Sequence, residues 1–185
     1  MKLRLLALIL GVAVSGQVLA ATALEKLQQQ AEQGDAQAQC QLGLAYAKGE
    51  VGKPDMKQAE TLLQKAVDQK ATCGYLILGA FYSDVQHDYK KSRPLLEKAA
   101  AQNSAPAMIQ LGNLYEYGQG VEKDYKTATQ WYAKAAKLGS EDGEYKLALS
   151  YYYGKGVAKD EKKANQMMDG LCKKGADSAC EFLKD

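Results

Sequence analysis

The chain has few side chains that could do chemistry: one histidine, His87, and four cysteines, Cys40, Cys73, Cys172 and Cys180. Acid–base and nucleophilic catalysis need a base held beside a second reactive group. The sequence contains no Gly-x-Ser-x-Gly elbow, phosphate-binding loop or His-Glu-x-x-His pair. We therefore expect no catalytic residue, no metal site and no cofactor, and we interpret His87 as an exposed loop residue.

The N-terminal segment 1–20 has the pattern of an export signal. Lys2 and Arg4 precede an apolar stretch, 5–14, that is too short to span a membrane. Small residues then predict cleavage after Ala20, and no cysteine follows that would accept a lipid. We expect a soluble periplasmic or secreted protein without a membrane span after signal cleavage. A retained N-terminal anchor is the alternative.

The charge balance argues against a nucleic-acid partner. The formal net charge is +2, and loss of Lys2 and Arg4 with the signal brings it to about zero. Lysines recur along the chain but alternate with acidic residues, as on a solvated helix face. No basic stripe of the kind that binds nucleic acid is present.

One segment in the second half of the chain predicts a helix hairpin. Leu111, Gly112 and Tyr115 are three to four residues apart and share a helix face. A glycine in mid-helix costs about 1 kcal/mol, so Gly112 predicts a second helix passing close against it. Gly118 ends the first helix, and Asp124 begins the next as its N-cap.

The same signals recur four times, as in a repeat protein. Each first helix contains Leu-Gly or Leu-Ala and then a tyrosine, and an aspartate begins each second helix. The tyrosines are Tyr46, Tyr82, Tyr115 and Tyr151, and the aspartates are Asp55, Asp88, Asp124 and Asp160. The last two steps between aspartates are 36 residues, and the first is 33 because the second repeat lacks the glycine turn.

This pattern resembles the Sel1-like repeat (SLR) family, a branch of the tetratricopeptide-like helical repeats. The matching motif is Leu-Gly-x-x-Tyr-x-x-Gly-x-Gly-Val at Leu111–Val121, followed by Asp124, Ala128, Trp131 and Gly139. The fourth repeat departs from it at Ala148 and Leu171. The resemblance covers essentially the whole mature chain. It implies an all-α fold, a right-handed superhelical solenoid of antiparallel helix hairpins, and says little about function.

The recurrence predicts one repeat domain, 21–185, after the signal. A helix over 22–33, with Leu24, Leu27 and Ala31 as its apolar stripe, should cover the first repeat. The four repeats are expected at 35–70, 71–104, 105–139 and 140–175, and a short closing helix at 178–184.

Four cysteines in an exported chain favour disulfides over free thiols. Cys172 comes late in a second helix and Cys180 early in the closing helix, so antiparallel packing around Gly175 can bring them within bonding reach. The family resemblance implies the same pair. Cys40 and Cys73 would then join neighbouring first helices. Three pairings are possible, the other two stay open, and a metal site is the alternative.

Twelve tyrosines against two phenylalanines are unusual for a core alone. Tyrosine combines a large contact area with a polar tip, which suits recognition. We expect one partner-binding face on the first helices of the third and fourth repeats, formed by Asn113, Glu116, Tyr117, Tyr145, Lys146 and Tyr152. The alternative is that these tyrosines fill loose packing in the closing repeats.

Helical repeats provide surface without chemistry, so we expect a non-catalytic scaffold that binds a protein or peptide through these first helices. An immunity or inhibitor protein against a periplasm-acting toxin is a second hypothesis. An enzyme acting on cell-wall material or β-lactams is a third, although no nucleophile-and-base pair supports it.

Overall fold

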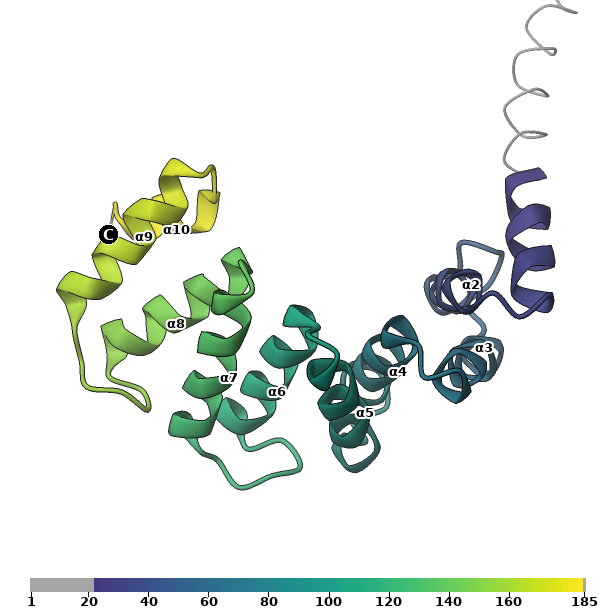
Figure 1. The fold of residues 1–185 in the computed structure, drawn as a ribbon, viewed down its shortest axis with the longest axis horizontal. Helices are drawn as coiled ribbons and strands as arrows, with labels where there is room; N and C mark the ends of the chain where they lie inside the picture. The colour runs from purple at the N-terminus through teal and green to yellow at the C-terminus, as the bar shows by residue number, and fades with distance from the viewer. Residues whose placement is uncertain (1–21, 185) are drawn as a thin grey trace, which may run out of the picture. The chain divides into compact units, whose positions relative to one another are not determined.

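The computed structural model describes residues 22–184, so the expected signal segment and its cleavage site lie outside the described residues. Those residues form helices joined by loops, with no strand among them (Figure 1). A helix over residues 22–32 comes first. It is followed by α2 (Ala36–Lys48), α3 (Met56–Asp68), α4 (Thr72–Asp84), α5 (Tyr89–Ala101), α6 (Ala105–Tyr117), α7 (Tyr125–Lys137), α8 (Glu141–Tyr153), α9 (Glu161–Lys173) and α10 (Asp177–Phe182). The predicted all-α fold of helix hairpins is confirmed.

The predicted aspartate N-caps are present at the start of the second helix of every hairpin. The Asp124 carboxylate accepts from the backbone amides of Lys126, at 2.9 Å, and Thr127, at 3.2 Å. Asp55, Asp88 and Asp160 cap α3, α5 and α9 in the same way. These bonds satisfy amides that have no partner within the helix, so each second helix begins at a residue that its sequence determines.

The second glycine of each Gly-x-Gly turn lies against the preceding hairpin. A Cβ atom at Gly120 would collide with the Cβ of Tyr89, and one at Gly156 with the backbone carbonyl of Tyr125. The turn can therefore contact the start of the preceding second helix only because it lacks side chains there. In the shortened loop of the second repeat, His87 adopts φ 54° and is exposed, as predicted for a loop residue.

The described helices form two compact units, one ending at Gly74 and the other beginning at Tyr75, so that the boundary falls inside α4. The single repeat domain expected from the sequence stays a prediction. In the first unit, the helix over residues 22–32 packs Leu24 and Leu27 onto a cluster that contains Leu42. The apolar stripe predicted for this helix is therefore the face that covers the first repeat.

In the second unit, the C-terminal end is closed by a core cluster of four buried residues: Ala148, Met168, Leu171 and Ala179. Ala148 and Leu171 are the two positions where the fourth repeat departs from the family motif. Both are fully buried. Leu171, which is larger than the alanine of the motif, packs in this core together with Ala179 of α10. The closing helix ends at Phe182, earlier than the predicted 184, and begins at Asp177.

The four cysteines are paired as Cys40–Cys73 and Cys172–Cys180, the arrangement favoured among the three that were open. The Cα atoms lie 6.1 Å apart in the first pair and 4.7 Å apart in the second. The first bond joins α2 to the start of α4, and the second joins α9 to α10. Paired cysteines are compatible with an extracytoplasmic protein.

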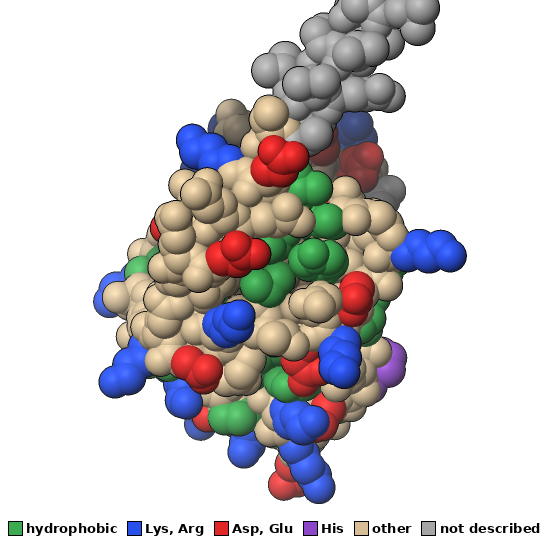
Figure 2. Space-filling model, turned by 90° about the vertical axis from the view of Figure 1, so that its right-hand side faces the viewer, with side chains coloured by type: hydrophobic (Ala, Val, Ile, Leu, Met, Phe, Trp, Pro, Cys, Tyr) green, Lys and Arg blue, Asp and Glu red, His purple; other side chains and the backbone are tan. Residues whose placement is uncertain are grey.

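The surface mixes charges of both signs. On the face shown in Figure 2, basic and acidic side chains are interspersed and do not separate into one area of a single sign. Exposed ion pairs such as Lys173–Asp169, at 2.7 Å, add little stability. Within residues 22–184, none of the helices is long and apolar enough to cross a membrane. In that same range, no three His, Cys, Asp or Glu side chains gather in a way that could hold a metal ion.

Candidate partner-binding site

Tyr132 on α7 occupies a core position that is aliphatic in the other repeats. The residue eight places after each capping aspartate is Leu63, Leu96, Tyr132 and Met168 in turn, and all four are buried. Tyr132 is only 2% exposed. Its ring fits because Gly112 on α6 has no side chain: a Cβ atom there would overlap the ring. The close passage predicted at Gly112 is therefore confirmed, and its partner is Tyr132.

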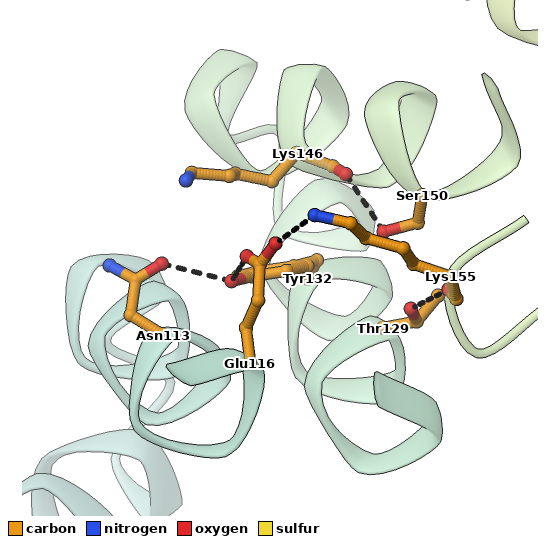
Figure 3. A network of polar contacts seen from close by, with 7 residues as sticks. All are labelled: Asn113, Glu116, Thr129, Tyr132, Lys146, Ser150 and Lys155. Carbon is orange, nitrogen blue, oxygen red and sulfur yellow. Dashed lines mark hydrogen bonds and ion pairs between the residues drawn. The ribbon is translucent and has the colours of Figure 1, made fainter. Parts of the chain in front are cut away.

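The hydroxyl of Tyr132 reaches two polar side chains of α6. It lies 2.9 Å from Asn113 Oδ1 and 2.8 Å from Glu116 Oε2 (Figure 3). A phenol has one proton and donates to one acceptor at a time, and a charged carboxylate is the stronger acceptor. The hydroxyl therefore donates to Glu116. The amide of Asn113, whose oxygen and nitrogen can exchange places by a half-turn, is then positioned to donate its NH₂ group to the phenol oxygen.

Lys155, in the loop after α8, extends this chain of contacts to the fourth repeat. Its ammonium donates to Glu116 Oε1 at 2.9 Å, and its backbone carbonyl accepts from Thr129 Oγ1 at 2.8 Å. The Glu116 side chain is 12% exposed and that of Lys155 39%. Asn113, Glu116, Tyr132 and Lys155 together form what we call the Tyr132 network (Figure 3).

Ionisation of the Tyr132 network follows from burial and pairing. Burial raises the pKa of Glu116, but hydrogen bonds from Lys155 and Tyr132, together with the charges of Lys155 and Lys146, outweigh it and hold that pKa below its ordinary value. The hydrogen bond to Glu116 raises the pKa of Lys155. Burial, and then the neighbouring Glu116 carboxylate, raise the pKa of Tyr132. At neutral pH the network therefore contains a carboxylate, an ammonium and a neutral phenol.

A small hollow lies beside the Tyr132 network. Its volume is about 160 Å³, and its lining residues are Glu116, Tyr117, Lys146, Leu149, Ser150, Tyr153 and Lys155. Tyr117 and Tyr153 are 60% and 58% exposed, unusually high for aromatic rings. They occupy equivalent positions in the third and fourth repeats, each directly before the glycine that ends the first helix. We call this site the tyrosine hollow.

The structure brings together part of the face predicted from the sequence. Glu116, Tyr117 and Lys146 line the tyrosine hollow, and Asn113 adjoins it through Tyr132. Tyr145 instead packs against the C-terminal core cluster. The Tyr152 ring packs edge-on against Phe182 of α10, with ring centroids 4.9 Å apart. The last two tyrosines thus make core contacts, as in the alternative reading.

Three residues of this region, Tyr132, Lys155 and Tyr153, were not predicted from the sequence. A comparison of repeats contained the signal for two of them. Tyr132 is the one polar side chain at a position that is otherwise leucine or methionine, and Tyr153 repeats Tyr117 at a spacing of 36. Lys155 gave no comparable signal, because it acts through a contact 39 residues distant.

The repeats match a known family over most of the chain. The family described as Sel1 repeat matches residues 36–70, 74–104, 105–140 and 142–169. This chain belongs to the Sel1 repeat family. Sel1 repeat proteins are generally protein-interaction scaffolds and mostly non-catalytic.

Solved Sel1 repeat structures share the fold. A Sel1 repeat protein from Oxalobacter formigenes is 33% identical, with a TM-score of 0.74 over 81% of this chain and 62% of its own. A protective antigen of uropathogenic Escherichia coli, which displays an SLR fold, is 32% identical, with a TM-score of 0.76 over 85% of this chain and 34% of its own. The chain thus spans less than two thirds of either protein.

An immunity protein from Pseudomonas aeruginosa is also similar. It is 26% identical, with a TM-score of 0.60 over 84% of this chain and 58% of its own. A search among curated proteins finds no match.

Proposed function

We propose that this protein is a non-catalytic scaffold, periplasmic or secreted, that binds a protein or peptide partner through α6 and α8. The observation that supports this most directly is the pair of exposed tyrosines, Tyr117 and Tyr153, that line the tyrosine hollow. Tyrosine is among the residues that most often dominate the binding energy of protein interfaces. Two such rings at equivalent repeat positions form a larger contact than scattered apolar residues would.

The size of the hollow favours a macromolecular partner. Pockets for small organic ligands measure about 300–1,000 Å³, whereas this one has about 160 Å³. That space suits one side chain of a bound protein or peptide, with the tyrosine rings supplying contact around it. The Tyr132 network gives the hollow a rigid wall, because Glu116 is fixed by both Lys155 and Tyr132.

The six residues expected from the sequence contribute unequally in this proposal. Glu116, Tyr117 and Lys146 contact the partner at the hollow, and Asn113 extends the face along α6. Tyr145 and Tyr152 contribute through whatever ring surface their core contacts leave uncovered, since both are only partly buried.

Affinity capture tests the proposal. A tagged mature protein is used to capture partners from periplasmic extract, beside a double variant, Tyr117→Ala with Tyr153→Ala. Both rings are exposed, so we expect the variant to keep its helix content and melting temperature but to lose the captured partner. A matched control, Leu138→Ala, removes an exposed apolar side chain at the end of α7 (46% exposed) and should change nothing. Identical capture by parent and double variant would refute this binding face.

A second candidate is an immunity or inhibitor protein against a periplasm-acting toxin. The similarity to the Pseudomonas aeruginosa immunity protein supports it. It predicts that a toxic protein encoded beside this gene forms a complex with the scaffold and loses its toxicity on co-expression. If the toxin killed cells equally well with and without the co-expressed scaffold, this candidate would be excluded.

A further inference from the structure

We propose that the tyrosine hollow binds a carboxylate side chain of an acidic peptide segment, with the Lys146 ammonium as the group that pairs with it. This inference rests on the proposed function and specifies the chemistry of the partner.

The charges lining the hollow leave one cation in excess. Its three charged residues are Glu116, Lys146 and Lys155, and the Glu116 carboxylate is already occupied by Lys155 on one oxygen and by Tyr132 on the other. Lys146 has no ion pair within residues 22–184; its ammonium lies 5.9 Å from the centre of the Tyr132 ring. In Figure 3 that ammonium stands apart from the Glu116–Lys155 pair. An incoming carboxylate would complete the charge balance.

The surroundings of Lys146 suit an acidic side chain that lies next to apolar ones. The lining combines the phenol rings of Tyr117 and Tyr153 with the aliphatic side chain of Leu149. A partly buried ammonium attracts a carboxylate more strongly than one in open water, because solvent screens it less. A basic segment would instead meet the surplus positive charge of Lys146 and be repelled.

The helix that presents Lys146 does not depend on its ammonium. The backbone carbonyl of Lys146 accepts a hydrogen bond from Ser150 Oγ at 3.0 Å. Lys146→Gln keeps that carbonyl and most of the side-chain length while removing the charge. Lys137→Gln, in the last turn of α7, removes one charge outside the hollow and is the matched control.

A random peptide library displayed on phage is selected on the immobilised mature protein. The affinity of the selected peptides is then measured by fluorescence anisotropy. We expect the selected peptides to be enriched in Asp or Glu beside apolar residues. Lys146→Gln should weaken their binding roughly 2- to 5-fold, as expected for a partly exposed ion pair. Replacing the peptide's acid by its amide should cause the same loss, and the two changes together should not add. Lys137→Gln should leave the affinity unchanged.

Three results would overturn the inference in distinguishable ways. In the first, the selected peptides lose binding with Tyr117→Ala and Tyr153→Ala but show no acidic enrichment and no response to Lys146→Gln. The proposed function would then stand, and only the inference that the hollow binds a carboxylate would be wrong. If no selected peptide depended on the two tyrosines or on Lys146, the hollow would be excluded as a binding site. Both the proposed function and this inference would then be wrong. Binding of anionic phosphatidylglycerol vesicles that falls with Lys146→Gln, without acidic peptides, would assign the ammonium to a lipid surface.

Discussion

The aromatic ring of Tyr132 lies in the space that a side chain at Gly112 would occupy. The missing side chain lets the ring fit between α6 and α7, and the length of the ring brings its hydroxyl to Asn113 and Glu116. A core position that is Leu96 or Met168 in neighbouring repeats thus becomes a polar link between the two helices of a hairpin.

Gly112→Leu should lower the free energy of unfolding by about 1–3 kcal/mol, because the added side chain must displace the Tyr132 ring from a filled core. The measurement is urea denaturation followed by circular dichroism. Gly170→Leu is the matched control: a Cβ atom at Gly170 on α9 meets nothing within 4 Å. The free energy of unfolding of that variant should equal or slightly exceed that of the parent. Equal midpoints for Gly112→Leu and the parent would show that the close approach is not required.

Tyr132→Phe keeps the ring that packs at Gly112 and removes only the hydroxyl. Glu116 and Asn113 then lose a shared partner in a mostly buried position. We expect a loss of about 1–2 kcal/mol in the free energy of unfolding. Tyr117→Phe, on an exposed ring, should change it by less than about 0.5 kcal/mol. If the two variants lost equal stability, the hydroxyl contacts would have no special role.

The Glu116–Lys155 pair should stabilise the fold only within a pH window. The pKa of Glu116 is lowered on folding, so its contribution is present above its ordinary value of 4.5 and is lost as pH falls through the lower folded-state value. The pKa of Lys155 is raised, so its contribution is present below 10.5 and is lost as pH rises through the higher folded-state value.

Glu116→Gln tests that window. We expect it to lower the free energy of unfolding by about 1 kcal/mol near neutral pH, a modest value because solvent screens the half-exposed Lys155. The difference from the parent should shrink in acid below about pH 4.5. A difference that stayed constant down to the acid-unfolded state would contradict an ionised Glu116.

The two disulfides should differ in their contribution to stability. Cys40–Cys73 closes a separation of 33 residues and Cys172–Cys180 one of 8, and a longer loop restricts the unfolded chain more. Replacing the first pair by alanine should cost about 3–4 kcal/mol and the second about 2–3 kcal/mol. Non-reducing mass mapping of periplasmic material should find both bonds. Free thiols there, or the opposite order of stability loss, would contradict the assignment.

Local signals were enough to predict the hairpins. An N-cap such as Asp124 bonds to amides within three residues, and a turn such as that at Gly118 needs only the backbone freedom of its own residue. Gly112 predicted a close neighbouring helix, because a mid-helix glycine is unfavourable without one.

The candidate site depended on longer-range packing. The bond from Tyr132 to Glu116 spans 16 residues and that from Lys155 to Glu116 spans 39, so neither follows from periodicity along one helix. Tyr145 and Tyr152 were predicted on the same face as Tyr117. Their rings also contact the C-terminal cluster and Phe182, which the spacing along one helix does not predict. By itself the sequence determined the helix hairpins, their aspartate N-caps and their glycine turns. The tertiary structure decided which tyrosines are buried and which line a surface, because burial depends on the side chains that distant helices bring alongside.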